Sequence, residues 1–474
     1  MIAERASSDE PAVITDGGTW SGRELIERAA GAADFLDAAG APIGHPVVAL
    51  LSSTPLAFAL LIGAAATDRA LAPLGPKLTP SELVPIIDAL DAELIVTEPA
   101  YEPLAADVGA RTGRRVAVLD GVGRSARALS FDIAPDRPAA ILHTSGTTGL
   151  PKPVSYRQDR LAARTRVNAE LVRLGPGATY ASASPFHHIA GVGMLFVAMG
   201  SGAALASLPR FDLDAWDGLA ERGATHVLIV PTMVEMLLDA GRFSLPGLRV
   251  LQYGAASIHP DTLRRAMDAM PGVAFVNIFG QTEGSPVTCL TIEDHVLAAS
   301  GRPELLGSVG RAAPGVSVVI EGAGDDGIGE VVARGAHLFR TDDDGWMHTG
   351  DLGRLDADGY LYLSGRRGDK IIRGGENVYP MEVERVLAQH PNVAEVCVFG
   401  LPDRTWGEVV AAAIVLRRPD AAELDVDALR AFARERLAGF KVPTVWEQLD
   451  ALPRNMAGKV LRRELIAART ATGG

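Results

Sequence analysis

The stretch that decides the fold runs from Thr225 to Met270. There THVLIVP (225–231) leads into TMVEMLLDAG (232–241), and RVLQYGA (249–255) leads into PDTLRRAMDAM (260–270). Each short apolar run is typical of a buried strand, and each longer segment has apolar residues at helical spacing. Strands that alternate with helices predict a parallel sheet, because the helix carries the chain back to the same edge. The same alternation occurs earlier, at HPVVALL (45–51), AELIVTE (92–98) and RRVAVLD (114–120).

The pattern changes in the region before residue 365. GVSVVIEGAGDDGIGEVVARG (315–335) and GDLGRLDADGYLYLSG (350–365) are strand-like runs separated by Gly and Asp turns, which predict an antiparallel β module. Gly322, Gly324 and Gly327 match the dinucleotide fingerprint GxGxxG, but that fingerprint requires a helix after the glycines. Here a second strand follows, so we interpret the three glycines as an acidic hairpin turn.

The last hundred or so residues show a third pattern. The predicted helix MEVERVLAQH (381–390) precedes two strands and a further helix, DALRAFARERLA (427–438). This is an α+β unit of ordinary domain size. We therefore predict an α/β protein with two domains. Residues 1–366 form a large domain of parallel α/β subdomains plus the antiparallel β module, and residues 367–474 form a small α+β domain.

The chain is acidic overall. Its 474 residues carry a formal net charge of −13, so long-range repulsion disfavours nucleic acids and anionic membrane surfaces as partners. A phosphate site must therefore be local. Cys289 and Cys397 lie far apart without CxxC or Cys/His spacing, so no disulfide framework or zinc site is readable. Because the N-terminus also has no signal-peptide pattern, we expect a cytoplasmic protein.

Two apolar stretches are long enough to be mistaken for membrane spans. Residues 47–67 and 189–209 contain no charged side chain, and both meet the length criterion for a spanning helix. The first, however, is interrupted at residues 52–55 by Ser-Ser-Thr-Pro, and the second contains several glycines. These breaks predict buried strand and helix segments, so we expect no membrane insertion.

The most informative local motif is ILHTSGTTGLPK (141–152). Its residues 144–149 are all Thr, Ser or Gly, and Lys152 follows. Glycines let backbone N–H groups turn toward an anion, hydroxyls add donors, and the lysine adds a full charge. The spacing differs from the GxxxxGK[ST] of P-loop proteins. We interpret the tract as a phosphate-binding loop rather than as an exposed polar turn.

Two later motifs place carboxylates in glycine-containing turns. NIFGQTE (277–283) ends in Thr282 and Glu283, and a carboxylate beside a threonine can hold Mg²⁺ against a triphosphate. WMHTGD (346–351) ends in Asp351, which can accept hydrogen bonds from a ribose. Either motif alone is weak, since acidic residues beside glycine are common in turns.

The combination of motifs is far more specific. HTSGTTGLPK, GQTEG, HTGDLG, GRRGDKIIRGGENVYP and PRNMAGK occur in this order between residues 143 and 459. Together they resemble the adenylate-forming superfamily of acyl-CoA and aryl-CoA synthetases, peptide-synthetase adenylation domains and luciferases, over nearly the whole chain. The resemblance implies an acid–CoA ligase. Such an enzyme uses ATP and Mg²⁺ to convert a carboxylic acid to an acyl-adenylate, and then transfers the acyl group to coenzyme A.

The resemblance also implies roles for individual residues. Lys459 would bridge the carboxylate and the α-phosphate, where a fixed cation aimed at two anions lowers the barrier to their reaction. Thr282 would contact phosphate and Glu283 would bind Mg²⁺, while Asp351 would bind the ribose with support from Arg366. Further nucleotide contacts are implied for Thr144 (also as a metal ligand), Ser145, Gly146, Thr147, Thr148, Gly149, Lys152, Gly254, Ala255, Ala256 and Phe279.

Other positions concern the acyl pocket and the second step. His188 matches the histidine common at the acyl site, and His187 replaces an aromatic residue. Adjacent histidines point in different directions, which favours pocket lining over a shared metal. Gly368 occupies the hinge about which the mobile C-terminal domain would rotate. Gly374 and Gly375 would then line a channel for the pantetheine arm of coenzyme A, since glycine allows close approach.

Two alternatives remain open. Pro153 replaces the glycine that usually follows the loop lysine, and His187 and Gly368 also depart from the family pattern. The acceptor could therefore be a carrier-protein phosphopantetheine, an amine or another nucleophile instead of coenzyme A. A protein of another class, which binds nucleotides without catalysis, is disfavoured because Glu283 and Lys459 are present.

The carboxylic acid is not defined by the sequence. No Asp stands at His226 or its neighbours, where amino-acid activators usually bind an ammonium group, so an α-amino acid is disfavoured. Aromatic and medium-chain acids both remain open.

Overall fold

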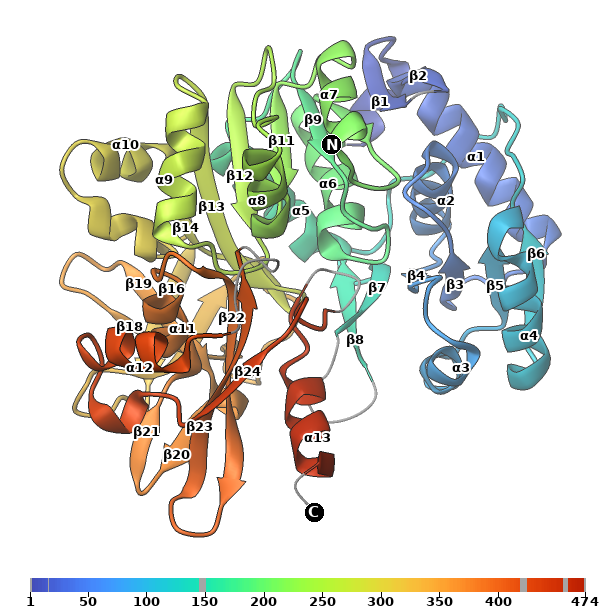
Figure 1. The fold of residues 1–474 in the computed structure, drawn as a ribbon. Coiled ribbons are helices and arrows are strands. Elements are labelled where there is room, and N and C mark those ends of the chain that lie inside the picture. Colours follow the sequence, from blue (N-terminus) through green and yellow to red (C-terminus); the bar gives the residue numbers. More distant parts are fainter. Residues whose placement is uncertain (1, 16, 145–150, 418–423, 455–458, 473–474) are drawn as a thin grey trace.

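A computed structural model describes residues 2–15, 17–144, 151–417, 424–454 and 459–472. The chain forms two α/β sheets, an antiparallel β module and a C-terminal α+β unit. In Figure 1 the first sheet lies beside the second, and the C-terminal unit (orange to red) lies below the second sheet. The predicted α/β fold class is confirmed.

The first sheet positions the two ends of the predicted phosphate-binding loop. Its strands are ordered β6 (Arg115–Val118), β5 (Leu94–Thr97), β3 (Val47–Leu50), β4 (Leu71–Pro73), β7 (Pro138–Thr144) and β8 (Lys152–Arg157). Neighbours are parallel except β7 and β8, an antiparallel pair in which Thr144 lies opposite Lys152. The helices that accompany these strands are α1 (Gly22–Ala38), α2 (Pro55–Ala66), α3 (Pro80–Asp88) and α4 (Glu102–Thr112).

The second sheet contains the stretch on which the fold prediction rested. Its order is β15 (Arg311–Ala312), β14 (Gly284–Leu290), β13 (Ala274–Gln281), β12 (Val250–Gly254), β11 (His226–Ile229), β9 (Thr179–Ser182), β10 (Ala204–Ser207), β1 (Pro11–Thr15) and β2 (Gly18–Ser21). The strands from β13 to β1 are mutually parallel, whereas β14, β15 and β2 run antiparallel to their neighbours. Its helices are α5 (Gln158–Leu171), α6 (Ile189–Ser201), α7 (Leu213–Glu221), α8 (Pro231–Asp239), α9 (Pro260–Ala269) and α10 (Ile292–Ala299).

The two membrane-like stretches form buried α/β elements, as predicted. Residues 47–67 become β3 and α2, and residues 189–209 contain α6 and β10. The Ser-Ser-Thr-Pro break starts α2, because the side chain of Thr54 accepts a hydrogen bond from the Ala57 backbone N–H (3.3 Å) and Pro55 stands at the first helical position. In the part of the chain that the structure describes, no helix has the length and apolar character needed to cross a bilayer.

The antiparallel module is also confirmed. It consists of β16 (Val316–Glu321), β17 (Gly329–Gly335), β18 (Met347–Leu355) and β19 (Leu361–Arg366), paired in that order. β16 and β17 pair through Glu321 and Glu330 on either side of the GxGxxG match. That match is therefore a hairpin turn, as interpreted.

The C-terminal unit begins where β19 ends. Its elements are η4 (Arg367–Asp369), β20 (Ile371–Arg373), β21 (Glu376–Val378), α11 (Pro380–Leu387), β22 (Val393–Asp403), β23 (Gly407–Leu416), α12 (Val426–Arg434), η5 (Gly439–Lys441), β24 (Val445–Gln448) and α13 (Arg462–Thr472). The helix predicted at 381–390 ends at Leu387, and a turn at Ala388 and Gln389 follows it. Three short 3₁₀ helices lie elsewhere: η1 (Ala3–Ser7), η2 (Pro99–Tyr101) and η3 (Pro303–Gly307). The division into domains at residue 366 stays a prediction.

Close packing of α1 on α2 yields a test of the fold. A Cβ added at Gly63 in α2 would lie 2.3 Å from the backbone oxygen of Ala29 in α1, whereas one at Gly218 in α7 would meet no atom within 4 Å. Helix propensity alone favours alanine at both positions by about 1 kcal/mol. We expect Gly63→Ala to lower the free energy of unfolding by about 1–2 kcal/mol, because overpacking outweighs propensity. Gly218→Ala should raise it by roughly 0.5–1 kcal/mol. Urea titrations followed by circular dichroism measure both, and stabilisation by Gly63→Ala would contradict the packing.

Candidate active site

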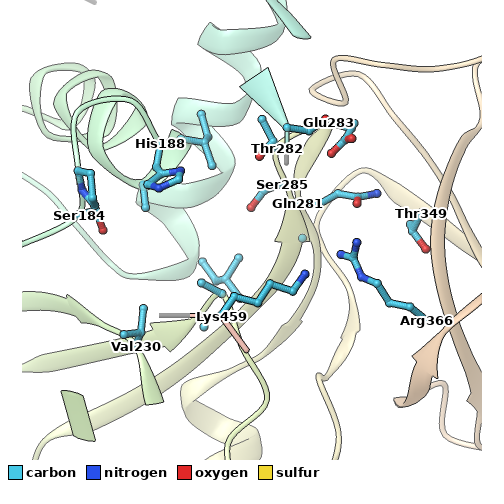
Figure 2. A pocket seen from close by; sticks show the side chains of 18 of the residues that line it. Ser184, His188, Val230, Gln281, Thr282, Glu283, Ser285, Thr349, Arg366 and Lys459 are labelled. Atoms are coloured by element: carbon cyan, nitrogen blue, oxygen red, sulfur yellow. The ribbon is translucent and has the colours of Figure 1, made fainter. Parts of the chain in front are cut away.

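One large cavity lies where the parts of the molecule meet. Its volume is about 1290 Å³. Val230 follows β11, Gly254 ends β12 and Gln281 ends β13, so the carboxyl ends of parallel strands form one wall, the usual place for ligands in α/β sheets. Lys459 and α13 contribute from the C-terminal unit. Figure 2 shows side chains from these separate segments pointing into a common space.

The cavity is strongly basic although the protein is acidic. Three acidic residues line it: Glu283, Asp369 and Glu408. Eleven basic residues line it: Lys77, Lys152, Arg164, Arg210, Arg340, Arg366, Arg367, Lys370, Lys459, Arg462 and Arg463. Such an excess inside a protein of net charge −13 concentrates anions at this one place.

The ends of the predicted phosphate-binding loop reach this cavity. Thr144 at the end of β7 and Lys152 at the start of β8 both line it, held opposite each other by the antiparallel pairing of their strands. Ser145, Gly146, Thr147, Thr148 and Gly149, which we also predicted as phosphate contacts, lie outside the described residues.

Thr282 and Glu283 form the turn from β13 to β14 and line the cavity. Hydrogen bonds to their backbone fix both residues. The Tyr156 hydroxyl donates to the Thr282 carbonyl (2.5 Å), and the backbone N–H groups of Phe339 and Arg340 donate to the Glu283 carbonyl (2.8 and 3.0 Å). The Glu283 carboxylate makes no ion pair with any residue in the described ranges, so its oxygens are available to a ligand.

Asp351 and Arg366 form an ion pair at the cavity wall. They lie opposite each other on β18 and β19, with Arg366 Nε 3.1 Å from Asp351 Oδ1. Burial raises the pKa of Asp351, while the charges of Arg366 and Lys459 act in the opposite direction. Arg366 lines the cavity, as do Thr349 and Gly350, whereas the Asp351 side chain is only 11% exposed beside them.

Lys459 extends into the cavity from the C-terminal unit. In Figure 2 its amine points toward the space between Gln281 and Arg366. Desolvation in the cleft lowers the pKa of Lys459, the charge of Arg366 lowers it further, and Asp351 raises it. The segment after the lysine is anchored by Arg462, which pairs with Asp369 (2.5 Å) and Glu384 (2.6 Å).

His188 and His187 have different surroundings. His188 caps α6 and lines the cavity, and burial lowers its pKa, so its ring is neutral at pH 7. The His187 ring contacts that of His188, with ring centroids 4.4 Å apart and the planes tilted by 45°, and it lies against Gly75 rather than lining the cavity. Burial lowers the pKa of His187 to about 3. The predicted lining role therefore holds for His188 alone.

Among the predicted nucleotide contacts, Gly254 and Ala255 line the cavity, whereas Ala256 and Phe279 do not. Side chains alternate along β13, so Ile278 lines the cavity and the Phe279 ring packs instead against the cluster that contains Val287 and Leu338. The resemblance placed Phe279 beside adenine. The ring lies outside the cavity lining, and its contact with adenine stays a prediction.

Gly374 and Gly375 lie away from the main cavity. They form the two-residue turn between β20 and β21, with φ values of +59° and +89° that favour glycine. Gly375 lines a second cavity of about 570 Å³ next to Asn377 and Lys441. The structure thus gives these glycines no contact with the site that contains Lys459.

Sequence reasoning missed several residues that the cavity brings together. Arg462 lies three residues after Lys459, and Thr349 lies two residues before Asp351, so closer attention to those motifs could have found them. Arg164 and Arg340 lie in no motif, and the sequence holds no signal for them.

The chain belongs to the AMP-binding enzyme family. The model of that family matches residues 2–341, and the model of the AMP-binding enzyme C-terminal domain matches residues 382–459. The protein is therefore an adenylate-forming ligase of the acyl-CoA and aryl-CoA synthetase family.

Individual relatives differ in their named acceptors. The fatty acid–[acyl-carrier-protein] ligase ScoC of Streptomyces coeruleorubidus is 33% identical, covering 96% of this chain and 92% of the relative. A sulfoacetate–CoA ligase of Cupriavidus necator is 32% identical, covering 90% and 88%. ATP-bound MatB from Rhodopseudomonas palustris gives a TM-score of 0.90 at 30% identity over 99% of this chain and 97% of MatB. Apo MatB gives 0.78 at 29% identity over 100% and 99%.

The electrostatics of Lys459 can be tested without assaying any activity. We expect Lys459 to titrate below the ordinary lysine value of 10.5, because desolvation and Arg366 both disfavour its charged form. Arg366→Gln should raise the pKa of Lys459, and Asp351→Asn should lower it. Competitive labelling with acetic anhydride across a pH series, read by peptide mass spectrometry, measures all three. A pKa of Lys459 that is the same in both variants as in the parent would contradict the geometry.

Proposed function

We propose that the protein activates a carboxylic acid with ATP to give an acyl-adenylate and then transfers the acyl group to coenzyme A. One observation carries this proposal. Lys459, Arg366 and the Thr282–Glu283 turn share a single basic cavity, although they are distant in sequence and Lys459 belongs to the C-terminal unit.

The first step needs two anions to meet. A carboxylate oxygen of the acid attacks the α-phosphorus of ATP, and the bond from that phosphorus to the leaving pyrophosphate breaks. Lys459, in its charged form, would contact both the carboxylate and the α-phosphate and so offset their repulsion. Lys152 and Thr144 would contact the departing phosphates. Asp351 would accept hydrogen bonds from the ribose, oriented by its pairing with Arg366.

The residues at the turn fit Mg²⁺. No described residue forms an ion pair with the Glu283 carboxylate, so its oxygens can bind a metal ion. Thr282 and Thr144 add hydroxyl oxygens in the same cavity. Oxygen donors of this kind suit a hard cation that is shared with phosphates. Glu283 would hold Mg²⁺ together with Thr282 and Thr144, and the bound ion would neutralise part of the triphosphate charge.

The second step requires Lys459 to withdraw. The coenzyme A sulfur attacks the acyl carbon, AMP leaves, and a thioester forms. In our proposal the C-terminal unit rotates about Gly368, which brings Gly374 and Gly375 to the cavity in place of Lys459. The likeness to the ATP-bound form of MatB supports the view that the present conformation serves the first step.

Gly368 itself supports a hinge. Its φ lies outside the left-handed region, and an added Cβ would meet no atom within 4 Å, so the present conformation does not require glycine there. The wider range of backbone angles that glycine allows at residue 368 therefore matters only in a second conformation of the chain.

The chief rival keeps the adenylate and changes the acceptor. ScoC is named for a carrier-protein acceptor, which gives this rival a concrete form. The Cupriavidus ligase is named for coenzyme A, which supports our choice of acceptor. Both outcomes preserve the first step, so the acceptor must be tested separately from adenylation.

Adenylation is tested by ATP–pyrophosphate exchange, and transfer by mass spectrometry of the thioester. With a cognate acid, ATP and coenzyme A, we expect an acyl-CoA product and AMP. Lys459→Ala should reduce exchange by roughly 100-fold or more, because a fixed charge at a developing transition state contributes several kcal/mol. The matched control is Lys441→Ala, a lysine outside the main cavity that pairs with Glu382. Exchange without any thioester would favour the carrier-protein rival, and normal exchange in Lys459→Ala would refute the assignment of that lysine.

The hinge is tested by separating the two steps. Gly368→Ala should leave pyrophosphate exchange within about twofold, because alanine fits the present conformation. It should slow thioester formation by roughly 5- to 30-fold, the effect of about 1–2 kcal/mol for a left-handed backbone at a non-glycine residue. Gly439→Ala serves as the control in the same unit, since a Cβ there also meets open space. If Gly368→Ala slowed pyrophosphate exchange and thioester formation by the same factor, this would argue against a hinge at residue 368.

A further inference from the structure

Arg164 stands apart from the other cavity cations. It lies on α5, its side chain is 3% exposed, and it lines the cavity. Its guanidinium packs against α6, so closely that a Cβ on Gly193 would lie 2.6 Å from Nη1. Most of the other basic residues of the cavity are partly open to solvent, whereas this one is enclosed by protein and by the cavity.

The charge of Arg164 is not balanced within the protein. Its Nε and Nη1 atoms are fully buried without a hydrogen-bond acceptor, and no carboxylate of the described residues acts on it. The neighbouring hydroxyls of Tyr156 and Tyr180 are engaged, donating to the Thr282 carbonyl and to Gln252 respectively. A guanidinium remains protonated under all ordinary conditions. A buried cation without a counter-charge is strongly unfavourable. A bound anionic ligand would supply the counter-charge that the protein does not.

The walls around Arg164 suit an organic ligand rather than phosphate alone. Met194, Leu228 and Ile278 supply apolar surface of the same cavity. His188 also faces this cavity, and its buried Nε2 has no hydrogen-bond partner. An apolar pocket with a few fixed polar groups is the usual form of a small-molecule site.

We infer that the carboxylic acid substrate carries a second anionic group, which pairs with Arg164 while the reacting carboxylate lies near Lys459. This inference rests on the proposed function, because it concerns the acid that is adenylated. A guanidinium N–H group can donate to an oxygen of a carboxylate or of a sulfonate. The shared chemistry is therefore an acid with an anionic far end.

The wild-type enzyme provides the first test. Adenylates are trapped as hydroxamates with ATP and hydroxylamine, so the identity of the acceptor does not enter. Matched pairs of equal length are compared: succinate with butyrate, glutarate with valerate, adipate with hexanoate, and terephthalate with benzoate. Sulfo acids and ω-hydroxy acids of the same lengths form further arms. We expect the best dianionic acid to exceed its monoanionic partner in kcat/KM by roughly 100-fold or more.

The arms give distinct outcomes. Preference for a dicarboxylic or a sulfo acid supports the inference and identifies the anionic group. Preference for monoanionic or hydroxy acids overturns it while leaving adenylation intact. Failure of every acid to give hydroxamate, together with no ATP–pyrophosphate exchange, overturns the proposed function itself and this inference with it.

Variants at position 164 separate recognition from structure. Arg164→Met should remove most of the dianion preference through KM while retaining activity on the monoanionic partner, and Arg164→Lys should keep part of the preference. Arg166→Met, an exposed arginine on the same helix, is the matched control and should change nothing. Replacing an unpaired buried cation with an apolar residue should leave Tm unchanged or higher. If Arg164→Met lowered kcat/KM equally for the dianionic and the monoanionic acid, or raised only the KM for ATP, the role of Arg164 would be overturned.

Discussion

The ion pair between the buried Asp351 and the partly exposed Arg366 is the contact on which the arrangement of the site depends. It joins two antiparallel strands at the cavity wall, and Arg366 is the last residue of β19. The chain passes from that residue directly into the short helix at 367–369. A buried carboxylate holds its partner in one position, because the alternative is an uncompensated charge. One pair therefore shapes the cavity wall and also fixes the point from which the C-terminal unit departs.

The same charges make the conformation sensitive to ligands. Lys459 and Arg366 approach each other in the cavity, and the charge of Arg366 disfavours the charged form of Lys459. Asp351 pairs with Arg366 and Asp369 pairs with Arg462, and both carboxylates also favour the charged form of Lys459. A bound polyanion would relieve the repulsion. Because that relief exists only while Lys459 is in place, nucleotide binding and the present placement of the C-terminal unit favour each other.

Much of the fold could be predicted because its signals are local. The run from Thr225 to Met270 shows strands and helices through periodicity alone, and both pairs formed as expected. The order of strands could not be predicted in the same way. β1 lies beside β10, although almost two hundred residues separate them in the chain, and no local pattern encodes that pairing.

The site residues, too, could be predicted where a local motif marks them and not where their position depends on tertiary structure. Thr282, Glu283 and Lys459 were found because each lies in a motif, and the structure brings them to one cavity. Phe279 does not line that cavity, because the direction of its side chain depends on strand register, which motif matching ignores. Arg164 was missed because α5 carries other arginines, and nothing in the sequence shows which of them turns inward. The surface that we propose to face the acid belongs largely to α5, α6 and β11, while the proposed nucleotide contacts come from other elements. Selectivity for the acid can therefore diverge during evolution, or in a directed library, without disturbing the chemistry of ATP.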